Sequence, residues 1–377
     1  MNTRNIQTVI EKVFNADLPR LSDIEFLLSL EREDELTILF NCADAIRKEY
    51  VGDEILLRGL VEFSNHCRNT CLYCGLNKCS TSLKRYRLDE NQIMAAIEKI
   101  ADSKIKTVVL QSGEDDDLDT IRLAKLIEII KSYFDIAVTL SVGERSYEDY
   151  KLWKLAGADR YLLKIETTDK EIYRSLHPGM SFENRLKCSR NLKKLGYQNG
   201  SGCLVGLKGQ TIKSLAKDIL FFKKENFDMI GIGIFIPHEA TPLRKEPLGS
   251  LKLALKVIAV TRIVTKNTHL PATTAIGSIG ANDARFFALK AGANVIMPNF
   301  TPLPYRMLYD IYPGKRCVKE HNDQGLCEIE KLAELLNRSI NYSRGDSLKE
   351  NIPESVNTRG EPREKKFYNL IKELLND

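Results

Sequence analysis

Short apolar runs alternate with longer amphipathic stretches over most of this 377-residue chain. The runs have the length of buried strands, and the longer stretches repeat apolar residues every three or four positions, as helices packed on one face do. Eight runs are candidate strands: 59–63, 107–110, 136–140, 160–165, 203–206, 229–235, 271–276 and 294–297. Five stretches are candidate helices: 90–103, 120–133, 146–155, 182–195 and 212–225. This alternation predicts an α/β fold, a (β/α)8 barrel, although periodicity alone leaves a doubly wound sheet open.

The two ends of the chain depart from this alternation. Residues 1–50 predict an N-terminal helical extension, in which Ser22 to Glu25 has the form of a capping box and Cys42 lies on an apolar stripe as a buried thiol. From about Gly345 the chain is polar and broken by Pro and Gly, which predicts a flexible linker before a short amphipathic segment, 367–375. We therefore expect a barrel over 51–317 and a C-terminal helical appendage with a polar tail over 318–377.

Composition narrows the class of protein. With 43% hydrophobic and 28% charged residues, the chain is expected to be globular rather than disordered, collagen-like or coiled-coil. No apolar run approaches the roughly 20 residues that a membrane span needs, and the N-terminus lacks the core of a signal peptide, so we expect a cytoplasmic protein with no membrane association. The 56 basic residues barely exceed the 51 acidic ones, which argues against nucleic-acid binding but suits an acidic small molecule.

The cysteines point to metal chemistry. An odd number, nine, without a secretion signal argues against a disulfide framework. Cys67, Cys71 and Cys74 form a C-x3-C-x2-C pattern after the first candidate strand, where a barrel places its active site, whereas Cys79 is outside the spacing. Zinc sites usually pair two such groups and ferredoxin-type clusters use four cysteines. Three thiolates suit a 4Fe–4S cluster with one iron open to a reactant; a zinc or redox-inert thiol site is the alternative.

This spacing, with Tyr73 just before the third cysteine, resembles the cluster loop of radical S-adenosylmethionine (SAM) enzymes. In that family SAM chelates the open iron, and an electron from the reduced cluster cleaves SAM to methionine and a 5′-deoxyadenosyl radical. No protein side chain then acts as a conventional nucleophile, because SAM supplies the reactive group. The resemblance implies SAM-binding residues at the ends of successive strands and in the next helix: Tyr73, Gly113, Glu114, Ser141, Glu166 and Arg185.

Longer strings, among them Cys71–Leu76, Leu110–Asp115 and Tyr312–Lys315, resemble the HydE family, the radical SAM maturases of FeFe-hydrogenase. The resemblance runs from about Gly59 to Cys317. It implies as substrate a cysteine-bound iron complex with CO and cyanide, delivered by another maturase, and an electron donor as a further partner. It also implies cavity-lining substrate contacts: Gln111, Thr139, Arg160, Thr273, Thr274, Tyr309 and Tyr312. An Arg and a Thr pair would donate hydrogen bonds to a carboxylate or cyanide.

Departures from the family pattern leave alternatives. Lys164-Ile165 stands where the family often has Arg-His, which loses a bidentate donor. Cys317 and Cys327 lack a C-x2-C partner, so we expect no complete second cluster. Gly200 replaces the strand cysteine of biotin synthase, which disfavours sulfur insertion. A carbon-skeleton mutase similar to methylornithine synthase needs the same SAM site, and an iron–sulfur scaffold or redox sensor that never cleaves SAM is the non-enzyme alternative.

Overall fold

A parallel sheet of six strands forms most of a barrel. The computed structural model describes residues 5–280, 282–316, 318 and 321–349. The sheet has the order β2 (Gly59–Ser64), β3 (Thr107–Ser112), β4 (Ala137–Ser141), β5 (Arg160–Leu162), β6 (Gln198–Val205) and β7 (Met229–Ile234). Strands that are consecutive in the sequence are also neighbours in the sheet. Repeated right-handed β-α-β crossovers produce this arrangement.

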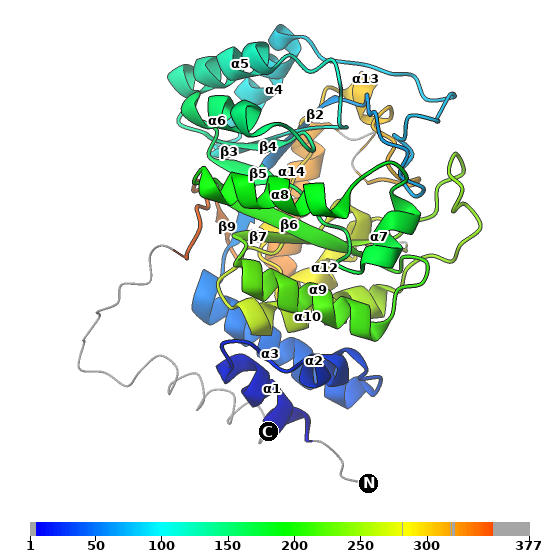
Figure 1. Ribbon diagram of the computed structural model, residues 1–377. Coiled ribbons are helices and arrows are strands. Elements are labelled where there is room, and N and C mark those ends of the chain that lie inside the picture. Colours follow the sequence, from blue (N-terminus) through cyan, green and yellow to red (C-terminus); the bar gives the residue numbers. More distant parts are fainter. Residues whose placement is uncertain (1–4, 281, 317, 319–320, 350–377) are drawn as a thin grey trace.

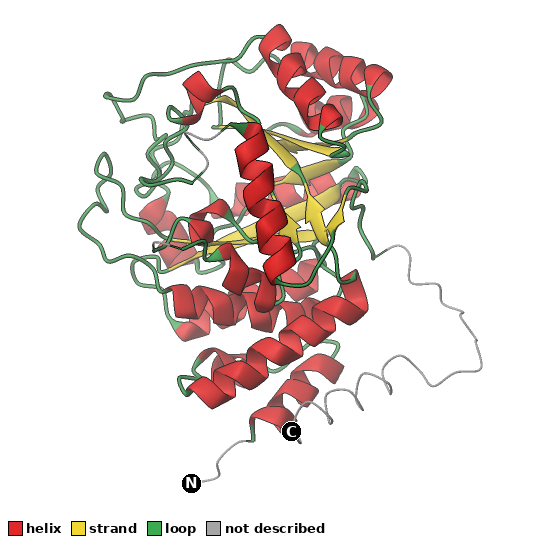
Figure 2. Ribbon diagram, turned by 180° about the vertical axis from the view of Figure 1, so that it is seen from behind, coloured by secondary structure: helices red, strands yellow, loops and turns green. Residues whose placement is uncertain are grey.

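The remaining barrel positions close this sheet into a ring. β1 (Ile55–Leu57) leads directly into β2 and pairs in parallel with β8 (Val295–Ile296), and Leu60 bridges to Asn299. On the other side, the segment around His269 and Pro271 bridges β7 at Met229 and β8 at Val295. These pairings complete an eight-membered (β/α)8 barrel, which confirms the predicted fold (Figure 2).

One predicted strand is largely wrong. The run 271–276 leaves the barrel wall after Pro271, and Thr274–Gly277 forms the short helix α11. The Thr273 hydroxyl donates to the carbonyl of Ile232 at 3.1 Å, so the chain turns at the rim of the barrel instead of continuing as a strand. A short apolar run does not distinguish a strand from a buried helical turn.

Helices surround the strands, and the five predicted ones are present. Their bounds are α4 (Glu90–Asp102), α5 (Thr120–Tyr133), α6 (Tyr147–Leu155), α7 (Lys170–Leu176), α8 (Phe182–Lys194), α9 (Ile212–Glu225), α10 (Leu251–Thr265), α11, α12 (Arg285–Lys290), α13 (Leu303–Arg306) and α14 (Asn322–Leu335). In α4, Asp89 and Gln92 form a capping box and the apolar positions face the core. Among the described residues no helix is long and apolar enough to cross a membrane.

Three helices from the N-terminal region form an outer layer on one side of the barrel (Figure 1). They are α1 (Ile6–Asn15), α2 (Leu21–Leu28) and α3 (Glu33–Val51), and they pack mainly on α9 and α10. Cys42 is buried, as expected. The predicted capping box is wrong, because α2 begins at Leu21 and Ser22 lies inside its first turn.

The segment that follows β9 (Ile340–Asn341) closes the N-terminal end of the barrel. Asp346 accepts hydrogen bonds from Arg160 at 2.6 Å and from Gln198 at 2.9 Å, and the Ser347 hydroxyl donates to Asp228. The prediction of a flexible linker from Gly345 is therefore wrong for residues 345–349. Its polar residues are partners of buried polar groups, which composition cannot reveal. The predicted amphipathic segment 367–375 lies outside the described residues.

Candidate active site

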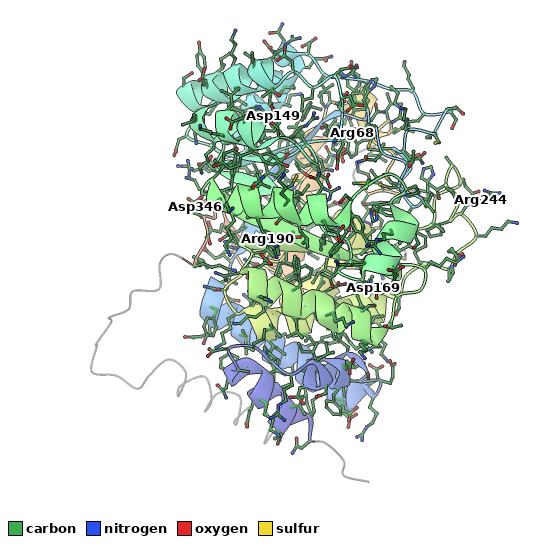
Figure 3. All side chains as sticks on the ribbon, in the orientation of Figure 1. Arg68, Asp149, Asp169, Arg190, Arg244 and Asp346 are labelled. Atoms are coloured by element: carbon green, nitrogen blue, oxygen red, sulfur yellow. The ribbon has the colours of Figure 1, made fainter. Side chains whose placement is uncertain are left out.

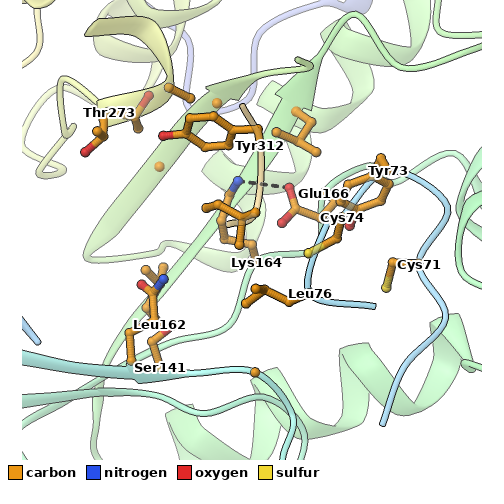
Figure 4. A pocket seen from close by; sticks show the side chains of 18 of the residues that line it. Cys71, Tyr73, Cys74, Leu76, Ser141, Leu162, Lys164, Glu166, Thr273 and Tyr312 are labelled. Atoms are coloured by element: carbon orange, nitrogen blue, oxygen red, sulfur yellow. Dashed lines mark ion pairs between the residues drawn. The ribbon is translucent and has the colours of Figure 1, made fainter. Parts of the chain in front are cut away.

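A cavity of about 390 Å³ opens at the carboxyl ends of the strands. It contains every predicted cluster and SAM residue: Cys67, Cys71, Cys74, Tyr73, Gly113, Glu114, Ser141, Glu166 and Arg185. Figure 4 shows Cys71 and Cys74 at one side, Thr273 and Tyr312 across the cavity, and Lys164 between them. The structure thus brings together residues that are more than 100 positions apart in the sequence.

The cysteine loop is held in place mainly through its backbone. Leu72 N donates to the carbonyl of Leu176 at 3.0 Å, and Arg68 N donates to the carbonyl of Glu114 at 2.8 Å. The Arg85 guanidinium donates to three carbonyls of this segment, at 2.6–2.9 Å: Asn65, Leu76 and Asn77. A planar guanidinium with several fixed donors suits such a role. Arg85 is therefore a positioning residue that the spacing of the cysteines did not reveal.

The environment of the three thiols fits an iron–sulfur cluster. Burial raises the pKa of Cys67 and Cys71, and for Cys71 the neighbouring thiols add to the effect; burial raises the pKa of Cys74 to about 12. Three free thiolates would be costly here, and iron supplies the positive charge that compensates them. Cys67, Cys71 and Cys74 all line the same cavity, where each thiolate would bind a separate iron of a bound cluster.

Next to the cysteine loop, one arginine connects two buried carboxylates. Arg185 Nη2 lies 2.9 Å from Glu114 Oε1, and Arg185 Nε lies 2.8 Å from Glu144 Oε1. Burial raises the pKa of Glu144, and Arg185 only partly offsets that effect. Two carboxylates and one guanidinium can pair with both an ammonium and a carboxylate, which is the polar end of an amino acid such as the methionine part of SAM.

Two glycines let Glu114 and the cysteine loop approach this position. A Cβ atom at Gly113 would lie 2.3 Å from the carbonyl oxygen of His66. A Cβ atom at Gly143, whose φ is +80°, would lie 1.8 Å from Glu114 Cγ. Both contacts are far below van der Waals distance, so larger residues at these positions would displace the loop or the acid.

Glu166 occupies a strained backbone position in the loop between β5 and α7. Its φ is +63°, unusual for a residue other than glycine, and its carboxylate lies 2.9 Å from Lys164 Nζ (Figure 4). Thr168 holds the following turn, because its backbone N–H and hydroxyl donate to Asp218 Oδ1 at 2.6 and 2.5 Å. Asp218 on α9 therefore fixes the loop that presents Glu166.

Replacing Asp218 by Asn is expected to change how stability depends on pH. Burial raises the pKa of Asp218 to about 7, so between roughly pH 4 and pH 7 the folded state binds more protons than the unfolded state, and stability falls as the pH rises. Asn keeps the acceptor without this cost. The advantage of Asp218→Asn over the native chain should widen by roughly 2–3 kcal/mol from pH 5 to pH 8, measured by urea unfolding. A constant gap would contradict the assignment.

Five of the seven predicted substrate residues line the cavity. They are Gln111, Thr273, Thr274, Tyr309 and Tyr312. The Gln111 amide donates to the Tyr309 hydroxyl at 3.2 Å, so these two residues act as a unit. Thr274 and Lys164 both line the cavity, where a hydroxyl and an ammonium are potential donors to an anionic substrate.

Thr139 and Arg160 do not line this cavity, and the prediction that they do is wrong. Both lie deeper, around a small void near the N-terminal ends of the strands. The Arg160 guanidinium is buried and donates to Asp346, Gln198 and the Thr107 hydroxyl. Arg160 is the first residue of β5, so its side chain serves the end of the barrel opposite to the active site.

The cavity wall also contains side-chain contacts that sequence reasoning missed. Tyr73 Oη lies 2.8 Å from His177 Nε2, and the Tyr173 ring stacks on His177 with centroids 4.2 Å apart. Lys315 Nζ forms a buried ion pair with Glu62. The Tyr73–His177 and Glu62–Lys315 pairs join residues from distant elements, and no local motif signals such partners. The Tyr173–His177 stack, in contrast, joins residues four positions apart at the end of α7.

Known proteins with a similar sequence or fold place this site in a family. Residues 61–222 match the profile of the Radical SAM superfamily. The [FeFe] hydrogenase maturase subunit HydE of Thermotoga maritima is 47% identical over 88% of this chain and 94% of its own length. The 3-methylornithine synthase of Methanosarcina acetivorans is 30% identical over 78% of this chain and 84% of its own.

Solved structures agree with this placement. A crystal structure of methylornithine synthase matches with a TM-score of 0.77 and 27% identity, covering 88% of this chain and 97% of that one. The maturase HydG matches in fold, with a TM-score of 0.78 at 20% identity over 91% of this chain and 77% of that one. The barrel and its three-cysteine loop define a radical SAM enzyme, which binds a 4Fe–4S cluster and SAM. Within that superfamily the chain belongs to the HydE family.

Proposed function

We propose that this protein cleaves SAM reductively and acts in the maturation of the FeFe-hydrogenase active-site cluster, on a cysteine-bound iron complex that carries CO and cyanide. The observation that carries the proposal is one cavity that combines the three-cysteine loop with the Arg185, Glu114 and Glu144 set, in a chain of the HydE family. Other hydrogenase maturases and an electron donor are the partners that this function requires.

Different residues of the cavity would bind the cluster, bind SAM and exclude water. A 4Fe–4S cluster, when bound, supplies the electron that cleaves SAM. Cys67, Cys71 and Cys74 would hold that cluster, and Glu114 and Arg185 would orient the amino-acid end of SAM. Ser141 and Glu166, which line the same cavity, would hydrogen-bond the hydroxyls of the ribose. The mostly apolar lining, with Leu60, Leu76 and Phe235 among its residues, excludes water from the reacting groups.

The substrate end of the cavity suits a small anion. Lys164 and Thr274 offer an ammonium and a hydroxyl, whereas the Thr273 hydroxyl already donates to the carbonyl of Ile232. The Lys164 ammonium lies 2.9 Å from the Glu166 carboxylate. A carboxylate or cyanide that reached Lys164 would share the ammonium with Glu166. A lysine gives one charged point contact here, where an arginine would give two parallel hydrogen bonds.

A carbon-skeleton mutase is the second candidate function. It is favoured by the 30% identity to 3-methylornithine synthase and by the close fit to a methylornithine synthase structure. The mutase would need the same cluster and SAM site and would differ only in the substrate. The higher identity to HydE favours maturation.

Hydrogenase activity in an anaerobic maturation mixture tests the proposal, with this chain in place of the HydE component. We expect active hydrogenase with the native chain and none with Cys71→Ala. Formation of 5′-deoxyadenosine without hydrogenase activity would overturn maturation while leaving a radical SAM enzyme, and formation of 3-methylornithine from a supplied amino acid would then identify the mutase. Absence of 5′-deoxyadenosine under reducing conditions would overturn both candidate functions and favour a scaffold or redox sensor.

A further inference from the structure

The cysteine loop separates the cavity from a groove on the outer surface. Cys71 and Tyr73 line the cavity, whereas Thr70 and Leu72, which alternate with them, line the groove. The Thr70 hydroxyl donates to the carbonyl of Pro178 at 3.0 Å, and Pro178 lines the groove as well. The groove therefore contacts the residues on either side of Cys71, one of the expected cluster ligands.

A buried side chain connects a cluster ligand to the groove through hydrogen bonds. Asn77 Nδ2 donates to the carbonyl of Cys74 at 2.7 Å, and Asn77 Oδ1 accepts from the backbone N–H of Cys79 at 2.9 Å. Asn77 and Cys79 both line the groove. Because electron tunnelling weakens steeply with distance and is aided by bonded contacts, this is a favourable path toward Cys74.

The groove has an apolar floor and a basic rim. Leu72, Pro178, Ala240 and Pro242 contribute apolar surface. The rim carries three exposed basic residues: Arg244, which lines the groove, and Lys78 and Lys245, which are next to lining residues in the sequence. None of the three forms an ion pair with a residue that the structure describes. Glu239 contributes one negative charge. Figure 3 shows Arg244 on a loop that projects from the molecule. An apolar centre with a charged rim is typical of a protein interface.

We infer that this groove is the docking surface for the protein that reduces the cluster, a small and acidic one-electron carrier. The inference rests on the proposed function, because only a cluster that turns over needs repeated reduction. In each encounter the carrier loses one electron and the cluster held by Cys67, Cys71 and Cys74 gains it, with no bond made or broken. Small interfaces steered by opposite charge suit such short-lived redox encounters.

Charge reversal on the rim tests this inference. The reconstituted full chain would be mixed anaerobically with a reduced acidic [2Fe–2S] ferredoxin, and the bleaching of the cluster absorbance followed by stopped flow. Lys78→Glu with Arg244→Glu is expected to slow reduction about tenfold or more at low salt, because steering by opposite charge is lost. For the native chain the rate should fall as salt screens the attraction. The matched control is Lys12→Glu with Lys125→Glu, two exposed lysines away from the groove, which should keep the native rate.

A second reductant separates this inference from the proposed function. Photoreduced deazaflavin is a small molecule that needs no docking surface, so it should reduce the native chain and the rim variant at rates within about threefold of each other. A rim variant that keeps the native rate with ferredoxin overturns the inference, and so does an equal loss with both reductants. A groove that binds a second copy instead would appear as dissociation of a dimer in the rim variant, with ferredoxin reduction unchanged. Cluster reduction without 5′-deoxyadenosine would count against the proposed function alone.

Discussion

Replacing Cys71 by alanine is expected to abolish formation of 5′-deoxyadenosine. Cys71 lines the cavity together with Cys67 and Cys74, the two other thiols expected to hold the cluster. Without one of three ligands the cluster cannot be held with a single open iron. We expect a loss of more than about a hundredfold, since removing even the outer partners of metal ligands costs 10–100-fold. Anaerobic assays with SAM and a chemical reductant, with iron and sulfide analysis of the same samples, would measure it.

The matched control is Cys327→Ala. Cys327 is an exposed cysteine on α14, far in sequence from the loop and outside the residues that line the cavity. This variant should retain native iron content and native turnover. If Cys71→Ala kept an appreciable rate, or if Cys327→Ala lost activity equally, the assignment of the cluster to Cys67, Cys71 and Cys74 would fail.

Breaking the buried ion pair of Glu62 and Lys315 is expected to destabilise the fold strongly. Glu62 on β2 is 1% exposed and Lys315 is 8% exposed, and Asn299 donates to the second carboxylate oxygen at 2.9 Å. The pair joins the first part of the barrel to the segment that follows β8. Lys315→Met leaves the carboxylate buried without its cation, which should lower the free energy of unfolding by about 3–5 kcal/mol, measured by urea denaturation.

The double variant distinguishes a lost pair from lost packing. Glu62→Gln with Lys315→Met removes both charges, so it should recover much of the stability that Lys315→Met loses. A matched single variant, Lys106→Met, removes one member of the exposed pair with Asp135 and should cost less than about 1 kcal/mol. A cost for Lys315→Met as small as this, or a double variant less stable than both single ones, would contradict a compensated buried pair.

The sequence was most informative where chemistry and repetition act locally. The alternation of strands and helices predicted the barrel, because buried parallel strands and amphipathic helices each have a period of their own. The cysteine spacing predicted three ligands on one loop, since those residues are neighbours in sequence. The resemblance to radical SAM enzymes then located Glu114, Ser141, Glu166 and Arg185, and the structure places all four at the same cavity.

The sequence was less informative where the role of a residue depends on its exact position along a strand. Thr139 lies on the same strand as Ser141 but two residues earlier, which places it one layer deeper in the barrel. Arg160 begins its strand, and its partner Asp346 is 186 positions away. The bounds of a short strand are poorly specified by its sequence, and long-range polar partners leave no periodic pattern.

The pairing of β1 with β8 and β9, which lie more than 200 residues later in the chain, has a consequence for synthesis on the ribosome. β1 is made early, yet its partners β8 and β9 are made late, and Arg58 and Arg160 receive acceptors from residues 344–346 only after that. A nascent chain that has emerged only as far as α12 would therefore expose the edge of β1 and carry two buried arginines without these partners. The barrel is complete only after residues 294–346 have been synthesised, and the growing chain needs protection from aggregation until then.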